Sequence, residues 1–174
     1  MKNTLLACLV ISTLIISCKD EPKRQVDTGT EQNIYRAADS MMAAFQRKDW
    51  RTFVRYNHPA MMKMMGGPEP FAAFITQQMK QIPDTAIKSL ETGKILQIVK
   101  TNKDLQCVLE QSMVMHMEGT KITRTTYLIG ESLDLGKTWT FFDASSNAMS
   151  LEKIKPDISP KIKIPTKKQE MEKL

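Results

Sequence analysis

The sequence predicts an α+β domain: three N-terminal helices packed on a curved four-stranded antiparallel sheet, with a C-terminal extended strap. Apolar residues recur at the period of a helix, about 3.6 residues, through the first half of the chain. After Pro83 the period changes to two, which is typical of strands. Short turn sequences separate the expected strands, so we expect an antiparallel meander covered by the helices.

The first helix is indicated by a single apolar stripe. Residues three and four apart lie on the same side of a helix. The stripe comprises Ile34, Ala38, Met41, Met42 and Phe45. Polar residues occupy the intervening positions, so we expect the stripe to face the sheet.

Two shorter helices are expected next. Asp49 can cap the second by accepting backbone N–H bonds, and Pro59 is expected to end it because His58 is then forced out of the helical region. The third begins near Pro68 and stops at Pro83. Its apolar face comprises Phe71, Phe74, Ile75, Met79 and Ile82.

Four strands are expected after these helices. They cover residues 86–100, 104–117, 120–133 and 138–143. Alternation is clearest in the second strand, where successive side chains point to opposite faces. Its inward row ends with Met113, Met115 and Met117.

The last hairpin has a specific turn signature. Residues 132–139 (Ser-Leu-Asp-Leu-Gly-Lys-Thr-Trp) match the Asp-box pattern Ser-x-Asp-x-Gly-x-Thr-Trp. Asp134 can accept N–H bonds inside the turn, Gly136 can adopt a positive φ, and Trp139 can pack across it. Sialidase propellers carry several such boxes, but this chain has one copy and no repeat of roughly 40–50 residues. The box therefore predicts a fastened hairpin and no glycosidase.

The N-terminus has the features of an export signal. Lys2 precedes an apolar run that is too short for a membrane span with its flanks. The run ends in residues 14–18 (Leu-Ile-Ile-Ser-Cys), which resemble the lipobox of bacterial lipoproteins. The resemblance implies that residues 1–17 are a signal peptide and that acylated Cys18 anchors the chain to a lipid bilayer. An ordinary cleaved signal with an incidental cysteine is the alternative.

The remaining boundaries follow from composition. Residues 18–30 are polar and predict a flexible tether, and residues 31–144 predict the domain. Residues 145–174 predict an appendage with a short helix at 147–155, then an extended strap and a frayed tail. Residues 19–21 (Lys-Asp-Glu) resemble a surface-export signal of Gram-negative lipoproteins. We therefore expect a location in the cell envelope, at the outer membrane, with surface exposure as a further expectation.

The charge and the cysteines of the chain limit which molecules and groups it is expected to bind. From Glu152 onward the tail has seven lysines against four acidic residues, so it supplies half of the net charge of +6. These lysines indicate a solvated tail or contact with anionic head groups. No nucleic acid is expected, because no aromatic side chains lie among those lysines to stack bases. Cys107 remains without a partner once Cys8 leaves and Cys18 is acylated, so we expect a buried, inert thiol.

The order of elements resembles the nuclear transport factor 2-like cone of the cystatin-like folds. The resemblance rests on the long first helix, residues 47–50 (Arg-Lys-Asp-Trp) with Phe53, His58-Pro59, and the final strand at 139–143 (Trp-Thr-Phe-Phe-Asp). It implies a conical pocket between sheet and helices. Members include ketosteroid isomerase, scytalone dehydratase and limonene epoxide hydrolase, along with many proteins without known activity.

The sequence leaves three functions open. The favoured one is a non-catalytic module that binds a small apolar ligand or an envelope protein, without a cofactor. We expect its pocket to be lined by Phe45, Phe74, Met113, Met115 and Met117. The second is a small isomerase, dehydratase or hydrolase that uses Asp143 with Tyr56 or His58, although no spacing reproduces a catalytic set of that family.

The third function is Cu(I) binding by a methionine cluster. Thioether sulfur is a soft ligand that suits Cu(I). Met61, Met62, Met64 and Met65 lie close together in an expected loop or turn. The competing interpretation is that methionine fills an irregular interior that has few aromatic residues. We favour the latter, and no metal site is expected.

Overall fold

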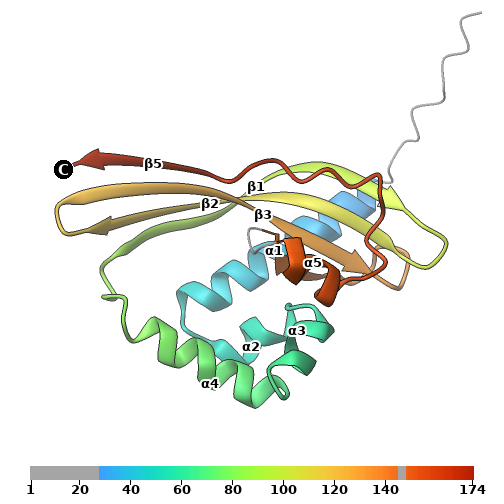
Figure 1. The fold of residues 1–174 in the computed structure, drawn as a ribbon, viewed down its shortest axis with the longest axis horizontal. Coiled ribbons are helices and arrows are strands. Elements are labelled where there is room, and N and C mark those ends of the chain that lie inside the picture. The colour runs from blue at the N-terminus through green and yellow to red at the C-terminus, as the bar shows by residue number, and fades with distance from the viewer. Residues whose placement is uncertain (1–27, 145–147) are drawn as a thin grey trace, which may run out of the picture.

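A computed structural model describes residues 28–144 and 148–174, with a layer of helices beneath one antiparallel sheet (Figure 1). The predicted α+β class is therefore confirmed. The signal peptide predicted for residues 1–17 and most of the tether predicted for 18–30 lie outside the described residues.

The helix α1 (Thr28–Gln46) is long and amphipathic, as the apolar stripe predicts. Ile34 and Ala38 are fully buried, and Met41 and Met42 are nearly so. Phe45 packs at the edge of the same apolar cluster. This side of α1 faces the sheet, so the stripe supplies one wall of the core.

The number of helices differs from the prediction, because the described residues contain five. The cap of α2 (Trp50–Arg55) forms as expected, with the Asp49 carboxylate accepting the Thr52 N–H at 3.1 Å. Pro59 does not merely end α2. It opens α3 (Pro59–Met64), because proline fits the first position of a helix, where its missing N–H costs no hydrogen bond.

Of the other two helices, one precedes the strands in the sequence and the other follows β4. The helix α4 (Pro68–Met79) ends before Pro83, as expected. The helix α5 (Ala148–Ile154) forms where a short helix is expected at the start of the appendage, before the proline-containing strap.

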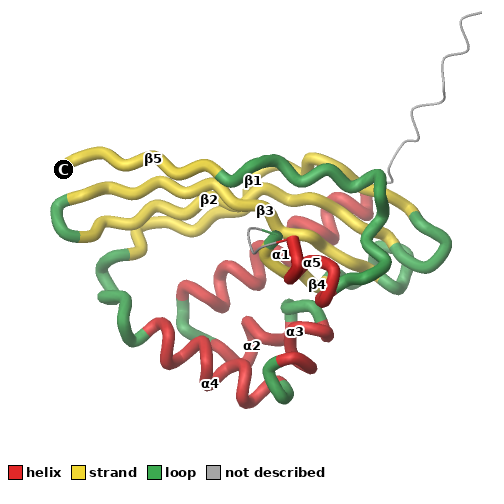
Figure 2. Tube along the Cα trace, in the orientation of Figure 1, coloured by secondary structure: helices red, strands yellow, loops and turns green. Residues whose placement is uncertain are grey.

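The sheet is a meander in the order β1-β2-β3-β4 (Figure 2). Its strands are β1 (Ile87–Lys100), β2 (Leu105–Met117), β3 (Thr120–Ser132) and β4 (Thr140–Asp143), and neighbouring strands are antiparallel. Register shifts interrupt the β1–β2 ladder between Ile87 and Gln97. Such bulges bend a strand and increase its twist.

A fifth strand corrects the expectation of four strands and a frayed tail. The strand β5 (Lys168–Lys173) pairs antiparallel with residues 120–125 of β3. The short β4 pairs only with residues 128–131, which leaves the first half of β3 as an open edge. The tail closes that edge, and a Lys121–Glu172 ion pair at 3.0 Å crosses the pair.

Both faces of the sheet are covered. On the inner face α1 packs against Cys107, Leu109 and Phe141. On the outer face Ile154 of α5 joins a second cluster, centred on Val108 and Ile129, against which the isoleucines of residues 158–164 also pack. Alternation along β2 thus places odd-numbered residues inward and even-numbered residues outward.

Among the residues that the structure describes, no helix is both long enough and apolar enough to cross a membrane.

Candidate functional site

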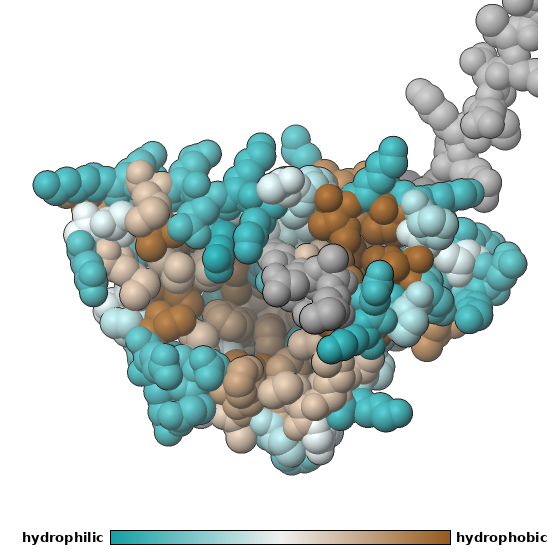
Figure 3. All heavy atoms as spheres, in the orientation of Figure 1, coloured by the Kyte–Doolittle hydropathy of each residue, from teal (hydrophilic) through white to brown (hydrophobic). Residues whose placement is uncertain are grey.

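A pocket of about 230 Å³ lies between α1, α2 and the inner face of the sheet. Figure 3 shows the molecule hollowed between the sheet and the helices on the face in view. The apolar walls comprise Met41, Met42, Phe45, Phe53, Leu90, Met113, Leu128, Phe141 and Phe142. The polar side chains at the pocket are Asn57, Gln111, Arg124, Thr126 and Asp143. The pocket is therefore apolar, with a few polar groups on its rim and floor.

The register of the strands explains the polar row. Met113 pairs with Arg124, and Gln111 pairs with Thr126, so all four side chains share the inner face. Thr126 Oγ1 donates to Gln111 Oε1 at 3.2 Å, and Gln111 Nε2 contacts the sulfur of Met42 at 3.0 Å. These amide and hydroxyl groups are satisfied within the protein.

Arg124 is different, since no hydrogen bond or ion pair joins its guanidinium to another described residue. It is half-buried on the pocket wall. Asp143 pairs with Leu128 across β3 and β4, four residues from Arg124 along β3. Four residues of strand span roughly 13 Å, so the cation and the carboxylate lie toward opposite ends of the pocket.

Only two of the five residues predicted to line the pocket do so. Phe45 and Met113 line the pocket. Met115 and Met117 are half-buried toward the β2–β3 turn, which extends past α1 in Figure 1, and neither is among the lining residues. Phe74 is 47% exposed on α4, where Phe71 is the buried aromatic residue. The predicted row of methionines on β2 therefore extends beyond the helices, which cover Met113 but not Met115 or Met117.

The three candidate catalytic residues do not meet in this pocket. Asp143 lines it, whereas Tyr56 packs against the inner core. His58 was expected at the end of α2 or on the rim of the cone. It is buried, Nε2 lies 2.7 Å from Glu131 Oε2, and Nδ1 accepts the Ala60 N–H at 3.2 Å. Both ring nitrogens are thus used in structural bonds, and the second caps α3.

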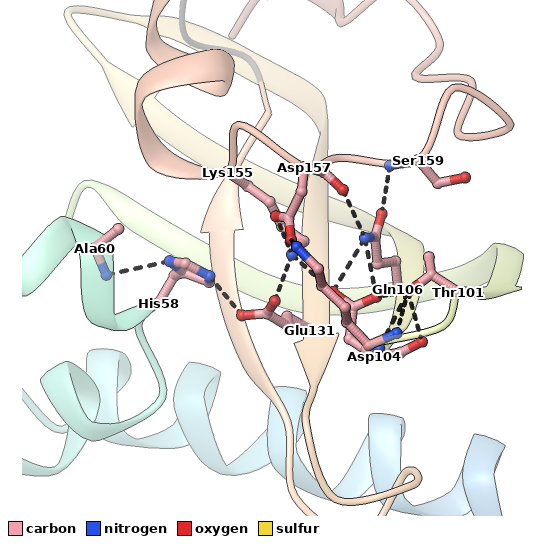
Figure 4. Close-up of polar contacts among 10 residues, drawn as sticks. His58, Ala60, Thr101, Asp104, Gln106, Glu131, Lys155, Asp157 and Ser159 are labelled. Atoms are coloured by element: carbon pink, nitrogen blue, oxygen red, sulfur yellow. Dashed lines mark hydrogen bonds and ion pairs between the residues drawn. The ribbon is translucent and has the colours of Figure 1, made fainter.

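A buried ionic cluster lies on the outer side of the sheet (Figure 4). The Lys155 ammonium is 3% exposed and forms ion pairs with Asp104 at 2.7 Å, with Asp157 at 2.9 Å and with Glu131. We call Asp104, Glu131, Lys155 and Asp157 the Lys155 cluster. The sequence indicated a solvated lysine here, because no local pattern marks a partner that is distant in the chain.

Gln106 links the Lys155 cluster to the backbone of the appendage. Its Nε2 donates to both carboxylate oxygens of Asp104 at 3.1 Å, and its Oε1 accepts the Ser159 N–H at 2.8 Å. Burial lowers the pKa of Lys155, but the three carboxylates outweigh burial and raise it. A lysine held charged in this way is a poor base or nucleophile. The cluster therefore fastens the appendage to the sheet.

Acid should weaken this fastening. Burial raises the pKa of Asp104, but hydrogen bonds from Lys155 and Thr101 outweigh it and lower the pKa from 3.8 to about 2. Since the folded-state pKa is the lower one, the stabilisation is present above pH 4 and is lost as pH falls through 2. We expect Asp104 to account for about 2 kcal/mol of that loss.

Urea titrations at a series of pH values between 6 and 2 would measure this loss. Asp104→Asn should be less stable than the wild type at pH 6 but lose less stability on acidification. Asp39→Asn, at an exposed position of α1, is the matched control and should follow the wild type. Equal pH slopes for wild type and Asp104→Asn would contradict the assignment.

The methionine cluster lies mainly on a helix instead of the expected loop. Met61, Met62 and Met64 belong to α3, and Met65 is its C-cap. Met61 packs on the outer core while Met64 is 55% exposed, so these two thioethers point into different surroundings. No group of three or more His, Cys, Asp or Glu residues is arranged to hold a metal ion within the described ranges.

Cys107 is buried, as expected, and burial raises the pKa of its thiol to about 12. The Asp-box turn also forms as predicted. Asp134 Oδ1 accepts the N–H groups of Lys137 and Thr138 at 3.1 and 2.9 Å, and Trp139 Nε1 donates to the Gly136 carbonyl at 3.1 Å.

No protein-family model matches the chain, and neither the curated proteins nor the solved structures give a significant match.

Proposed function

We propose that this protein is an envelope lipoprotein of nuclear transport factor 2-like shape that binds a small amphipathic molecule in the pocket beneath its sheet. The observation that carries the binding role is the Arg124 guanidinium in a mainly apolar pocket, where no other described residue pairs with it. A half-buried cation that no described residue neutralises favours an anionic group from outside. The anchor rests on the lipobox-like residues 14–18.

The volume of the pocket limits the ligand. A cavity of 150 Å³ holds a benzene-sized molecule, so a pocket of about 230 Å³ suits a body of roughly ten heavy atoms. Methionines of α1 and β2 line it, and their flexible side chains adapt to ligand shape. A single acidic group suits the Arg124 end, because Arg124 is the only cationic side chain among the described residues that line the pocket.

Binding without catalysis is the version that the geometry favours. A pocket enzyme would need its acid and base within hydrogen-bonding reach of one substrate. Of the three candidates only Asp143 lines the pocket, and the His58 ring is occupied on the other side of the sheet. The sulfur atoms of α3 offer no comparable support for Cu(I) binding, because Met61 packs into the core while Met64 points to solvent.

Octanoate and octanol form a matched pair of probes for the role of Arg124, since they share an alkyl chain and differ in the acidic group. Calorimetric titration should show that Arg124→Met weakens octanoate binding by about tenfold, the value of one charge-assisted hydrogen bond. Octanol binding should be unchanged or stronger. Arg36→Met, at an exposed position of α1, is the control and should change neither affinity.

Two results would contradict the proposal. If neither probe binds to the wild type, or if both bind without displacing each other, the pocket is not an amphiphile site of this size. If both probes bind but Arg124→Met affects them equally, Arg124 does not recognise the acidic group.

A further inference from the structure

The turn between β3 and β4 carries the two most exposed large apolar side chains of the described residues. Leu133 is 72% exposed and Leu135 is 76% exposed. Between them the Asp134 side chain turns back into the hairpin, where it accepts backbone N–H bonds. We call Leu133, Asp134 and Leu135 the leucine tip.

The leucine tip is rigid and partly strained. Ser132 Oγ donates to the Asp134 carboxylate at 2.8 Å and accepts the Gly136 N–H at 2.8 Å, which fixes the turn from inside. Leu135 has a φ of 61°, a conformation that asparagine or glycine adopts at lower cost. The leucine thus stabilises neither the turn nor the core. Strain of this kind is typical of positions that serve another purpose.

The leucine tip lies at the end of the sheet where α1 begins (Figure 1). Asn33 Nδ2, in the second turn of α1, donates to the Gly136 carbonyl at 2.8 Å. Ten residue steps separate Cys18 from Thr28, and they span at most roughly 36 Å. An acyl group on Cys18 would therefore hold the leucine tip close to a bilayer.

Charge at this end suits an anionic lipid surface. Leu105 pairs with Ser132, so the β1–β2 turn lies beside the leucine tip. The exposed side chains of Lys103 and Lys137 flank it from the two turns, and Lys103 also forms an exposed ion pair with Asp157 at 3.4 Å. Glu31 in the first turn of α1 and Asp157 beside Lys103 are exposed acids, so charge alone would attract weakly and the leucines must supply the main contact.

We infer that the leucine tip inserts into the lipid surface to which Cys18 anchors the chain, with Lys103 and Lys137 over anionic head groups. This orientation rests on the proposed anchor and goes beyond the proposed ligand. Interfacial insertion of apolar side chains beside basic residues is a common mode of peripheral membrane contact. It would hold the β3–β4 end of the domain against the bilayer.

The test uses the full chain, isolated from membranes and reconstituted into vesicles of phosphatidylethanolamine and phosphatidylglycerol. A fluorophore is attached at Leu133→Cys or, as the control, at Gln81→Cys, an exposed position beyond α4. The chain without an introduced cysteine measures background labelling, since Cys107 is buried. Brominated acyl chains should quench emission at position 133 and leave position 81 unquenched.

Flotation separates the anchor from the docking. The unmodified chain should float with the vesicles, and a Cys18→Ser variant should lose that anchor. If the unmodified chain does not float, the anchor and the docking both fail. If it floats but position 133 remains unquenched, the docking alone is wrong and the leucine tip serves another contact.

Leu135→Asn separates a membrane role from a structural one. Asparagine tolerates the left-handed conformation, so thermal stability should be equal or higher. Quenching of the fluorophore at position 133 should nevertheless fall, because the leucine that remains in the labelled tip is replaced by a polar side chain. Unchanged quenching in this variant would overturn the role of Leu135.

Discussion

Replacing Lys155 with methionine is expected to lower the free energy of unfolding by about 3–5 kcal/mol, the usual cost of removing one partner of a buried ion pair. The reason is the set of charges left behind. The Asp104 side chain is 1% exposed and that of Glu131 is 10% exposed, so both carboxylates would remain buried without their cation. Urea unfolding at pH 7 measures the loss.

Lys153→Met is the matched control, because Lys153 is exposed on α5, two residues away. It should change stability by less than about 0.5 kcal/mol. A loss below about 1 kcal/mol for Lys155→Met would contradict the Lys155 cluster, since a buried pair broken on one side costs more than that.

The pH dependence provides a second check on the Lys155 cluster. Wild type loses stability in acid because the pKa of Asp104 is lowered in the folded state. In Lys155→Met the pKa of Asp104 should instead rise, because the ammonium that outweighs the effect of burial is gone. The gap between variant and wild type should therefore narrow as pH falls. A gap that stays constant from pH 7 to pH 3 would mean that Asp104 and Lys155 are not coupled.

Local and periodic features were predictable from the sequence. The stripe of α1, the alternation of β2 between the two core clusters and the Asp49 cap each depend on residues a few positions apart, and all three form. The Asp-box turn forms for the same reason, since its donors and acceptors lie within residues 132–139. Such features are determined before any long-range contact is made.

The remaining features depend on contacts between distant parts of the chain. The residues of β5 are all exposed and show no apolar alternation, so only the open edge of β3 explains their pairing. Lys155 meets Glu131, which lies 24 residues earlier, and no periodicity marks that pair. Arg124 lies two residues from Thr126 and four from Leu128, so its side chain points to the same inner face of β3. This spacing could have identified Arg124 as a pocket residue.

Phe141 illustrates the same dependence and gives the second large expected effect. It is fully buried, lines the pocket and lies against Gly130, where an added Cβ would come within 2.9 Å of its ring. Its backbone N–H donates to the Tyr56 carbonyl at 2.7 Å, and its carbonyl accepts the His58 N–H at 2.8 Å. One residue of β4 thus joins the sheet, the helices and the pocket wall.

Phe141→Ala should lower the free energy of unfolding by about 3–5 kcal/mol and enlarge the pocket. Phe74→Ala, at a position that is 47% exposed, should cost less than about 0.5 kcal/mol. In calorimetric titrations the enlarged pocket should shift preference from octanoate toward longer acids such as dodecanoate, because the cavity leaves alkyl contacts unmade for the shorter chain. Equal stability losses for the two variants would place Phe74 in the core after all. If Phe141→Ala greatly lowers the free energy of unfolding but leaves the preferred chain length of the acid unchanged, Phe141 supports the fold without contacting the ligand.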